Sequence, residues 1–454
     1  MTTAYVRPAL PTPDRYPDAT GAVAAASAAI GWRRVFTAPP LRTLIEDALA
    51  NNRDLRIAAG RVEAAQANAR AQTAQRFPSL SALGLGARSG LPAGLSLTGR
   101  PTTSSLYLGA LSASWETDFW GRLRSLSQSA RESYLASEDA RRAVASGLIR
   151  EVAAGYLREL EYRERLELAR RTIANREESL RIVRRRYEVG SGSKLPVTQA
   201  QTLLGQAQTE RQALELARAQ NTESLALLVG RPVKREDAPG GLALADFAAP
   251  LSAGLPSELL VNRPDVRAAE HRLRAAHADI AAARAAYFPD ISLMASGGGA
   301  SAQLDKLFGT GTGLWSFTPT VTVPIFNGGR LDGALAGARA ERDIALAAYE
   351  QAIQSAFRDV ADALAARRWL AEQIQSTEQT LEALTERARL ADLSYANGRA
   401  AYLEVLEAQR DLFSAQEGLV QLRRAQLESE VDLYAALGGG LADGPGTNEA
   451  GSAT

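Results

Sequence analysis

Apolar residues follow a helical period in four parts of the chain, as two long runs and two shorter ones. The long runs are predicted from Arg122 to Tyr187 and from Arg330 to Tyr395. A helix of 66 residues would be about 100 Å long at ~1.5 Å per residue. Return helices are expected over Leu195–Val229 and Tyr402–Leu437, after turns that place Gly190 and Gly398 at left-handed helix ends.

Near the turns, apolar residues of both long runs recur every seven positions. A strict seven-residue repeat favours left-handed coiled-coil packing. The repeat consists of Leu166, Ile173, Leu180 and Tyr187 in the first run, and of Ile374, Leu381, Ala388 and Tyr395 in the second.

Four shorter segments alternate between apolar and hydroxyl-bearing residues, as strands with two different faces do. The clearest runs from Trp315 to Ile325, whereas Leu106 and Leu108 interrupt the alternation before Trp115. Each has about the ~9–11 residues that a tilted strand needs to cross a bilayer. The strand pairs are expected at 79–88 with 105–116 and at 290–300 with 315–326, joined by external loops at 88–104 and 301–314.

Aromatic residues gather around these segments, as they do at the two membrane interfaces of a barrel wall. The alternative that they form the core of a small soluble sheet stays open. The candidate interface residues are Trp115, Trp120, Trp315, Phe317 and Phe326.

Both patterns belong to one internal duplication. Gly121-Arg122-Leu123 recurs as Gly329-Arg330-Leu331, and the same offset of 208 residues maps Tyr187 onto Tyr395. The segment from Ala22 to Ile30 lacks a preceding basic region and is interpreted as a linker. The predicted divisions are an N-terminal extension at 1–40, repeat 1 at 41–230, a connector at 231–256, repeat 2 at 257–440 and a flexible tail at 441–454.

The strand count predicts an oligomer, because four strands cannot close a barrel and open sheet edges are not tolerated in lipid. Two copies would give eight strands with a filled interior, whereas three would give twelve strands and room for a lumen. The predicted fold class is mainly α with a β-barrel part, in which each duplicated chain supplies four strands and long coiled helices.

Composition excludes several classes of function. Lys and Arg total 52 and Asp and Glu total 51, so no basic stripe indicates nucleic-acid binding. The chain has no cysteine, and His271 and His277 are six residues apart, which favours structural roles over a metal site. No stretch reaches ~18 consecutive apolar residues, so no transmembrane helix is predicted. We therefore expect no cofactor, no metal and no catalysis.

Several specific stretches together resemble one known family from about Tyr5 to Gly440. The chain is similar to the TolC/OprM outer-membrane factors, most closely the OprM-like branch that serves resistance-nodulation-division efflux pumps. These stretches are Gly31-Trp32-Arg33, Asn51-Asn52-Arg53-Asp54-Leu55, Trp115-Glu116-Thr117-Asp118-Phe119-Trp120-Gly121-Arg122, Leu255-Pro256-Ser257, Arg263-Pro264-Asp265, Ala282-Ala283-Arg284-Ala285-Ala286-Tyr287-Phe288-Pro289 and Pro324-Ile325-Phe326.

The resemblance implies a homotrimer with a twelve-stranded β-barrel in the outer membrane of a Gram-negative bacterium. It also implies a periplasmic α-barrel of twelve helices and an equatorial belt built from the N-terminal extension, the connector and the tail. The implied partners are outer-membrane lipid, a periplasmic adaptor and an inner-membrane transporter. Branch members often begin with a lipidated cysteine. Here, either Met1 replaces it or this member lacks the lipid anchor.

The resemblance also implies a periplasmic gate at the second turn. Glu404 and Glu407 are three residues apart and share a helix face, so three-fold symmetry would form two rings of carboxylates. Without the resemblance, a solvated helix face is the favoured interpretation. Pro196 replaces the aspartate that often receives the closing bonds in the family, and Ser191, Ser193 or Thr198 are expected to substitute. The other gate residues that the resemblance implies are Tyr395, Arg399, Arg410, Leu403 and Leu406.

The predicted function is an outer-membrane channel of a tripartite multidrug efflux system, which conducts small molecules passively. Two alternatives remain. One is a type I protein secretion duct. The other is a soluble periplasmic or cytosolic coiled-coil scaffold whose sheet is buried, because the helices alone would fit that class equally well.

Overall fold

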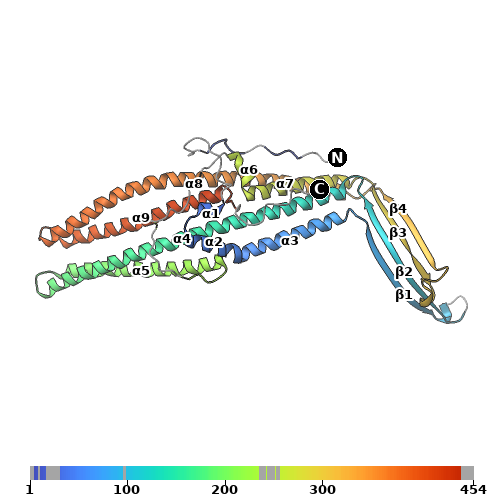
Figure 1. Ribbon diagram of the computed structural model, residues 1–454, viewed down its shortest axis with the longest axis horizontal. Coiled ribbons are helices and arrows are strands. Elements are labelled where there is room, and N and C mark those ends of the chain that lie inside the picture. The colour runs from blue at the N-terminus through green and yellow to red at the C-terminus, as the bar shows by residue number, and fades with distance from the viewer. Residues whose placement is uncertain are drawn as a thin grey trace. The chain divides into compact units, whose positions relative to one another are not determined.

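The computed structural model describes residues 5–8, 11–16, 31–95, 99–234, 242, 251 and 256–440. The predicted linker from Ala22 to Ile30, the tail at 441–454 and most of the connector at 231–256 lie outside the described residues. Helices and strands alternate twice in the same order (Figure 1). The helices are α1 (Trp32–Val35), α2 (Pro39–Asn51), α3 (Arg53–Ala74), α4 (Arg122–Glu188), α5 (Lys194–Val229), α6 (Leu259–Asn262), α7 (Pro264–Ala285), α8 (Arg330–Ala396) and α9 (Tyr402–Ala436).

The two long helices and their return helices agree with the predicted bounds to within one residue. Helices α4 and α8 each contain 67 residues, and neither contains proline. Pro196 lies in the first turn of α5, where its missing N–H removes no intrahelical hydrogen bond. Across the part of the chain that the structure describes, no helix combines the length and the apolar character that crossing a membrane requires.

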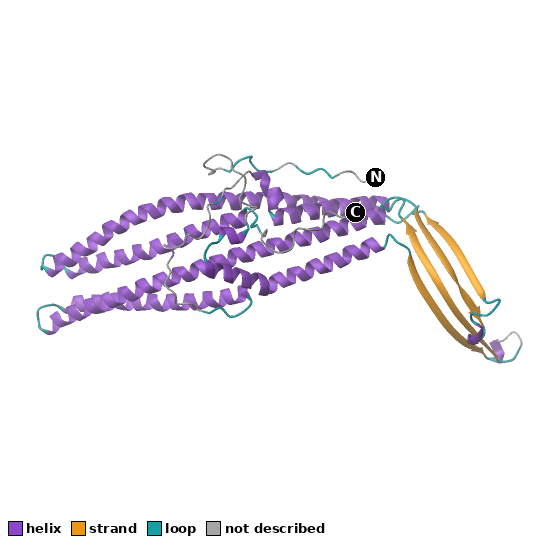
Figure 2. Ribbon diagram, viewed as in Figure 1, coloured by secondary structure: helices purple, strands orange, loops and turns teal. Residues whose placement is uncertain are grey.

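The four strands form one antiparallel sheet in the order β1-β2-β3-β4, the orange region of Figure 2. The outer strands β1 and β4 have no further strand partner among the described residues. The strands are β1 (Ser79–Leu91), β2 (Thr102–Thr117), β3 (Asp290–Ser301) and β4 (Gly313–Thr322).

Four strand ends differ from the predicted positions by two residues or more: the end of β1, the start of β2 and both ends of β4. Strand β1 continues to Leu91, which pairs with Thr102 at the start of β2, because backbone pairing continues through Gly and Ser without apolar side chains. Strand β4 begins at Gly313 and ends at Thr322, four residues before its predicted end. Thr322 pairs with Asp290, the first residue of β3, so the ladder ends there, and Pro324 has no N–H with which to extend it. The loops between paired strands are correspondingly shorter than predicted.

The register places hydroxyl groups in pairs on one face of the sheet. Ser81 faces Ser112 with an oxygen–oxygen distance of 2.7 Å, and Ser296 faces Ser316 at 2.8 Å. Since successive side chains point to opposite faces, Trp315, Phe317 and Val321 lie on the other face. The predicted alternation of β4 is therefore confirmed.

The chain divides into two compact units that cut across the repeats. The first contains residues 1–9, 60–138 and 268–349, and the second contains residues 10–59, 139–267 and 350–454. Each unit therefore combines corresponding parts of both repeats. The sequence divisions at 41–230 and 257–440 stay a prediction.

The second unit has a core in which distant segments meet. Gly31 bridges to Gly440, and the Trp32 N–H donates to the Gly440 carbonyl at 3.2 Å. Phe36 is fully buried and packs edge-to-face on Tyr434, with ring centroids 5.3 Å apart. The segment before α2 is thus fixed to the end of α9.

Candidate functional site

The two helical turns that the sequence analysis singled out are built identically. The Gly398 N–H donates to the Tyr395 carbonyl at 3.0 Å, and the Arg399 N–H donates to the Ser394 carbonyl at 2.8 Å. Gly190 closes α4 with the same pair of bonds. Both glycines have positive φ, 75° at Gly190 and 70° at Gly398. This is the Schellman motif, in which a residue in the left-handed conformation ends the helix. The chain then turns back along the return helix.

The predicted acidic gate residues lie on the first two turns of α9. Glu404 is exposed and Glu407 is half-buried, and neither side chain bonds to another described residue. The guanidinium of Arg399 is exposed, whereas Arg410 pairs with Asp411 at 2.9 Å. Both carboxylates are therefore available to contacts outside this chain.

Tyr395 contacts the neighbouring hairpin through a residue that the sequence analysis missed. The Arg186 guanidinium lies 4.9 Å from the centroid of the Tyr395 ring, and Tyr402 packs against the same ring at 5.0 Å. The suggested acceptors bond within their own hairpin, since the Ser191 and Thr198 hydroxyls donate to backbone carbonyls at 3.0 and 2.8 Å. A cation–π contact thus joins the two turns within one chain.

Leu403 and Leu406 were both expected at an apolar constriction, but the two side chains have different surroundings in the single chain. The Leu406 side chain is only 6% exposed and belongs to a cluster between the two hairpins, whereas Leu403 is 48% exposed. The reason is the helix period, which puts Leu406 on the face of α9 that packs against α4 and α5. The buried members of the cluster are Leu180, Val183, Val197, Ala200, Tyr402, Val405 and Leu406.

Farther from the turns, a buried group of charges joins the same two hairpins. Glu161 accepts a hydrogen bond from Arg165 at 3.1 Å and forms an ion pair with Arg424 of α9, whose Nε lies 2.6 Å from the carboxylate. Arg165 also reaches Glu210 at 2.9 Å and Glu417 at 3.4 Å. We call the contact of α9 with α4 and α5 the intrachain seam.

Burial changes the acid–base properties of the intrachain seam. Desolvation raises the pKa of Glu417 in spite of the nearby Arg165. Burial also lowers the pKa of Arg176, whose guanidinium donates to the Leu203 carbonyl at 2.5 Å and lies over the Phe413 ring. This group of charges was missed by the sequence analysis. The four-residue spacing of Glu161 and Arg165 is a signal for an ion pair on one helix, but it does not identify the partner on α9.

The aromatic residues at the strand ends form the junction between sheet and helices in the first unit. The indole N–H of Trp115 donates to the Arg76 carbonyl at 3.0 Å, and that of Trp120 donates to the Pro289 carbonyl at 2.8 Å. Trp120 also stacks on Phe288 with centroids 4.7 Å apart. Such rings have an apolar body and a satisfied polar group, as membrane-interface residues require.

The other three predicted interface aromatics are strongly exposed in the single chain. Trp315 and Phe317 lie on one face of β4, and Phe326 lies beyond its end. The described part of the chain therefore leaves all three side chains uncovered. Whether lipid covers them stays a prediction.

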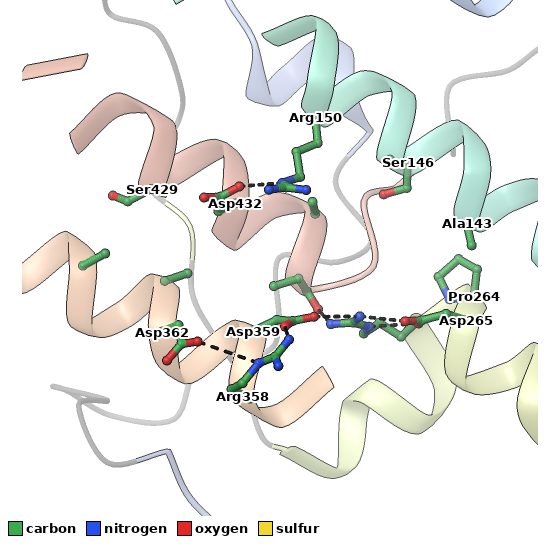
Figure 3. Close-up of a pocket in the computed structure, with 16 residues that line it drawn as sticks. Ala143, Ser146, Arg150, Pro264, Asp265, Arg358, Asp359, Asp362, Ser429 and Asp432 are labelled. Carbon is green, nitrogen blue, oxygen red and sulfur yellow. Dashed lines mark hydrogen bonds and ion pairs between the residues drawn. The ribbon is translucent and has the colours of Figure 1, made fainter. Parts of the chain in front are cut away.

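The Arg263-Pro264-Asp265 stretch binds three helices together beside a cavity of about 630 Å³. Arg263 forms ion pairs with Asp265 at 2.6 Å and with Asp359 of α8 at 3.0 Å, and also reaches the Ala436 carbonyl of α9. Arg150 and Asp432, which also line this cavity, point toward each other (Figure 3). The Arg150 Nε lies 2.6 Å from the Asp432 carboxylate. Because the charges are paired, the cluster joins the start of α7 to α8 and to the end of α9.

The histidines and the acidic residues form no metal site in the part of the chain described. His271 Nδ1 lies 2.6 Å from a carboxylate oxygen of Glu132, which is a contact between α7 and α4. Among the described residues, no group of three or more His, Cys, Asp or Glu side chains could hold a metal ion.

Comparison with known proteins gives one consistent result. The family described as "Outer membrane efflux protein" matches residues 44–231 and 255–439. The chain is 42% identical to the probable efflux pump outer membrane protein TtgC of Pseudomonas putida, over 96% of this chain and 91% of that one. It is 45% identical to the solvent efflux pump outer membrane protein SrpC of Pseudomonas putida, over 90% and 87%.

Solved structures agree over nearly the full length. A membrane protein from Pseudomonas aeruginosa is similar with a TM-score of 0.89 and 38% identity, over 97% of each chain. The open state of the Neisseria gonorrhoeae MtrE outer membrane channel is similar with a TM-score of 0.88 and 36% identity, over 97% of this chain and 98% of that one. With the duplicated strand pairs and helical hairpins described above, these matches show that the chain belongs to the outer membrane efflux protein family.

Proposed function

We propose that three copies of this chain form a duct that passively conducts small molecules from the periplasm to the exterior. The observation that supports this most directly is the open sheet, whose outer strands β1 and β4 lack strand partners among the described residues. Unpaired strand edges are not tolerated in lipid, so β4 of one chain would pair with β1 of the next. Twelve strands then enclose a lumen.

The helical hairpins support the same arrangement. Each chain contributes α4, α5, α8 and α9, so three chains would supply twelve helices to a periplasmic wall. The chain would perform no catalysis and would depend on a periplasmic adaptor and an inner-membrane resistance-nodulation-division transporter for its driving force. A lipid anchor at the native N-terminus would add membrane attachment.

The gate of the proposed duct lies at the second turn. Glu404 and Glu407 would form two rings of three carboxylates around the three-fold axis, which attract cations and repel one another. Leu403, Arg399 and Arg410 are exposed beside them and would complete the aperture. Tyr395 and the buried Leu406 would support this lining by holding α9 against the first hairpin.

Small molecules are favoured as the cargo over secreted proteins. Relatives of 42–45% identity are described as components of toluene, solvent and antibiotic efflux pumps, and one of 39% identity is described as a cation efflux system protein. The proposed cargo is therefore apolar or amphiphilic small molecules, and drugs among them.

Deletion of the gene in its natural host tests this function. We expect greater susceptibility to toluene and to antibiotics, restored by the wild-type gene, with protein secretion unchanged. Unchanged susceptibility combined with lost secretion of a protein would instead favour the type I secretion duct. A freely soluble monomer that needs no detergent would favour the coiled-coil scaffold.

A further inference from the structure

The two hairpins can be compared residue by residue, because the offset of 208 has no gap in the helices. Arg122 begins α4 and Arg330 begins α8, while Lys194 begins α5 and Tyr402 begins α9. The identical turns at Gly190 and Gly398 keep the two hairpins in step. Every residue of hairpin α4–α5 therefore has a counterpart in hairpin α8–α9.

The structure shows one of two kinds of seam that such a repeat creates. Within the chain, α9 packs against α4 and α5, and Glu161 pairs with Arg424 there at 2.6 Å. In a ring in which the two hairpins alternate, the contact between neighbouring chains repeats the contact within one chain. At that contact between chains, α8 stands where α4 stands in the intrachain seam, and α5 of a second copy stands where α9 does. The seam between chains would therefore join the counterparts of residues that meet in the intrachain seam.

The counterparts of the ion pair are two large apolar residues. Glu161 corresponds to Trp369 on α8, and Arg424 corresponds to Leu216 on α5. Trp369 is 50% exposed and Leu216 is 60% exposed in the single chain. The Arg368 guanidinium lies 4.7 Å from the Trp369 centroid and shields part of the ring.

Other charged residues of the intrachain seam also have uncharged counterparts in the other hairpin. Arg165 and Glu417, which pair at 3.4 Å, correspond to the uncharged Gln373 and Thr209. Arg176, which lies over the Phe413 ring, corresponds to Leu384, and Phe413 corresponds to Gly205. A side chain at Gly205 would meet open space in the single chain, so nothing in this chain fills that position.

We propose that Trp369 of one chain packs against Leu216 of a second copy, which makes the seam between chains apolar where the intrachain seam is ionic. The inference rests on the proposed trimer. It assigns Trp369 and Leu216 to the contact between neighbouring chains in the helical wall. Burial of a large aromatic ring against leucine is the kind of contact that dominates interface stability.

Cross-linking tests the contact directly, because the natural chain contains no cysteine. The full-length double variant Trp369→Cys with Leu216→Cys, treated with a short bis-maleimide, should give covalent dimers and trimers on a denaturing gel. Either single variant should give none. The control Glu378→Cys with Arg423→Cys replaces an exposed ion pair of 3.0 Å within one hairpin, and should add linker mass without joining chains.

Two outcomes would overturn the contact. A trimer in native mass spectrometry without interchain product would refute the contact alone, whereas a monomer would refute the proposed trimer as well.

A second measurement covers variants that assemble poorly. Trp369→Ala and Leu216→Ala should each lower the temperature of trimer dissociation, and the double variant should lower it less than the sum. A strictly additive effect would show that the two side chains do not meet.

Discussion

At the intrachain seam, Glu161 accepts a hydrogen bond from Arg165 on its own helix and forms an ion pair with Arg424 on α9. The Glu161 side chain is almost completely buried, so its carboxylate cannot exchange the two arginines for water. Apolar residues nearer the turn bring the same helices together. Individual charges therefore determine which helix faces meet, while the apolar cluster supplies contact area.

Replacement of Glu161 by glutamine should destabilise the helical part. Glutamine keeps the volume but removes one of the two carboxylates that face Arg424, the other being Glu428. The loss should therefore stay below the about 3 kcal/mol that a buried charge without any partner costs. Thermal unfolding of the purified protein would measure the loss. The matched control is Glu167→Gln, which removes an exposed pair with Arg171 and should change the midpoint little. Equal effects of the two variants would contradict a special role of the buried site.

Glu417 should make stability depend on pH. Burial raises the pKa of its carboxyl, so the folded protein binds this proton more tightly than the unfolded chain does. Its contribution to the free energy of unfolding is then complete below the ordinary glutamate pKa, and it is lost as pH rises through the raised value. The charges that face it are Arg165, Glu210 and Arg176.

The unfolding midpoint of the Glu417→Gln variant should vary less with pH than that of the wild type across the mildly acidic range. Glutamine resembles the protonated carboxyl, so the variant should match the wild type best at the acidic end. Parallel curves over the whole range would show that Glu417 does not titrate in the folded protein.

The gate assignment predicts altered ion selectivity at two carboxylates. In planar bilayers, the double variant Glu404→Gln with Glu407→Gln should lose cation preference several-fold, because two carboxylate rings would disappear. Glu382→Gln on α8, which removes one carboxylate per chain at an exposed position, serves as the control for loss of charge away from the turn. Identical selectivity of the gate variant and the wild type would remove both residues from the aperture.

At the scale of elements, the helices could be predicted closely and the strands less so. Proline-free runs of helix formers that end at glycine specify both ends of α4 and α8. The ends of β1 and β4 depend on backbone pairing and on Pro324 rather than on side-chain alternation. The burial of Leu406 and the contact of Arg186 with Tyr395 could not be predicted, because the period of one helix does not indicate which neighbour it meets.

The turn glycines should be sensitive to substitution because of their backbone conformation. At a φ of 70°, Gly398→Ala would place a Cβ in the left-handed region, at a cost of about 1 kcal/mol. Hydrogen exchange should show faster opening of residues 393–402. Gly190→Ala should do the same in the other hairpin, since its turn has the same bonds. An unchanged exchange rate in both turns would contradict the role of the left-handed ends.

At the scale of the whole molecule, this outer membrane efflux protein combines two copies of one unit that have diverged where they would meet the lumen. Glu404 corresponds to Pro196 and Glu407 corresponds to Gln199, so only one hairpin of each chain would present acidic groups. The intrachain seam contains buried ion pairs whose counterparts are uncharged. A ring of three chains would thus alternate between two types of seam and two types of turn.

Electron microscopy of particles purified from the outer membrane in detergent tests the trimeric duct most directly. We expect a three-fold symmetric cylinder with one continuous lumen, in which β4 of each chain pairs with β1 of the next. Single chains with an open sheet, or particles that remain soluble without detergent, would contradict it.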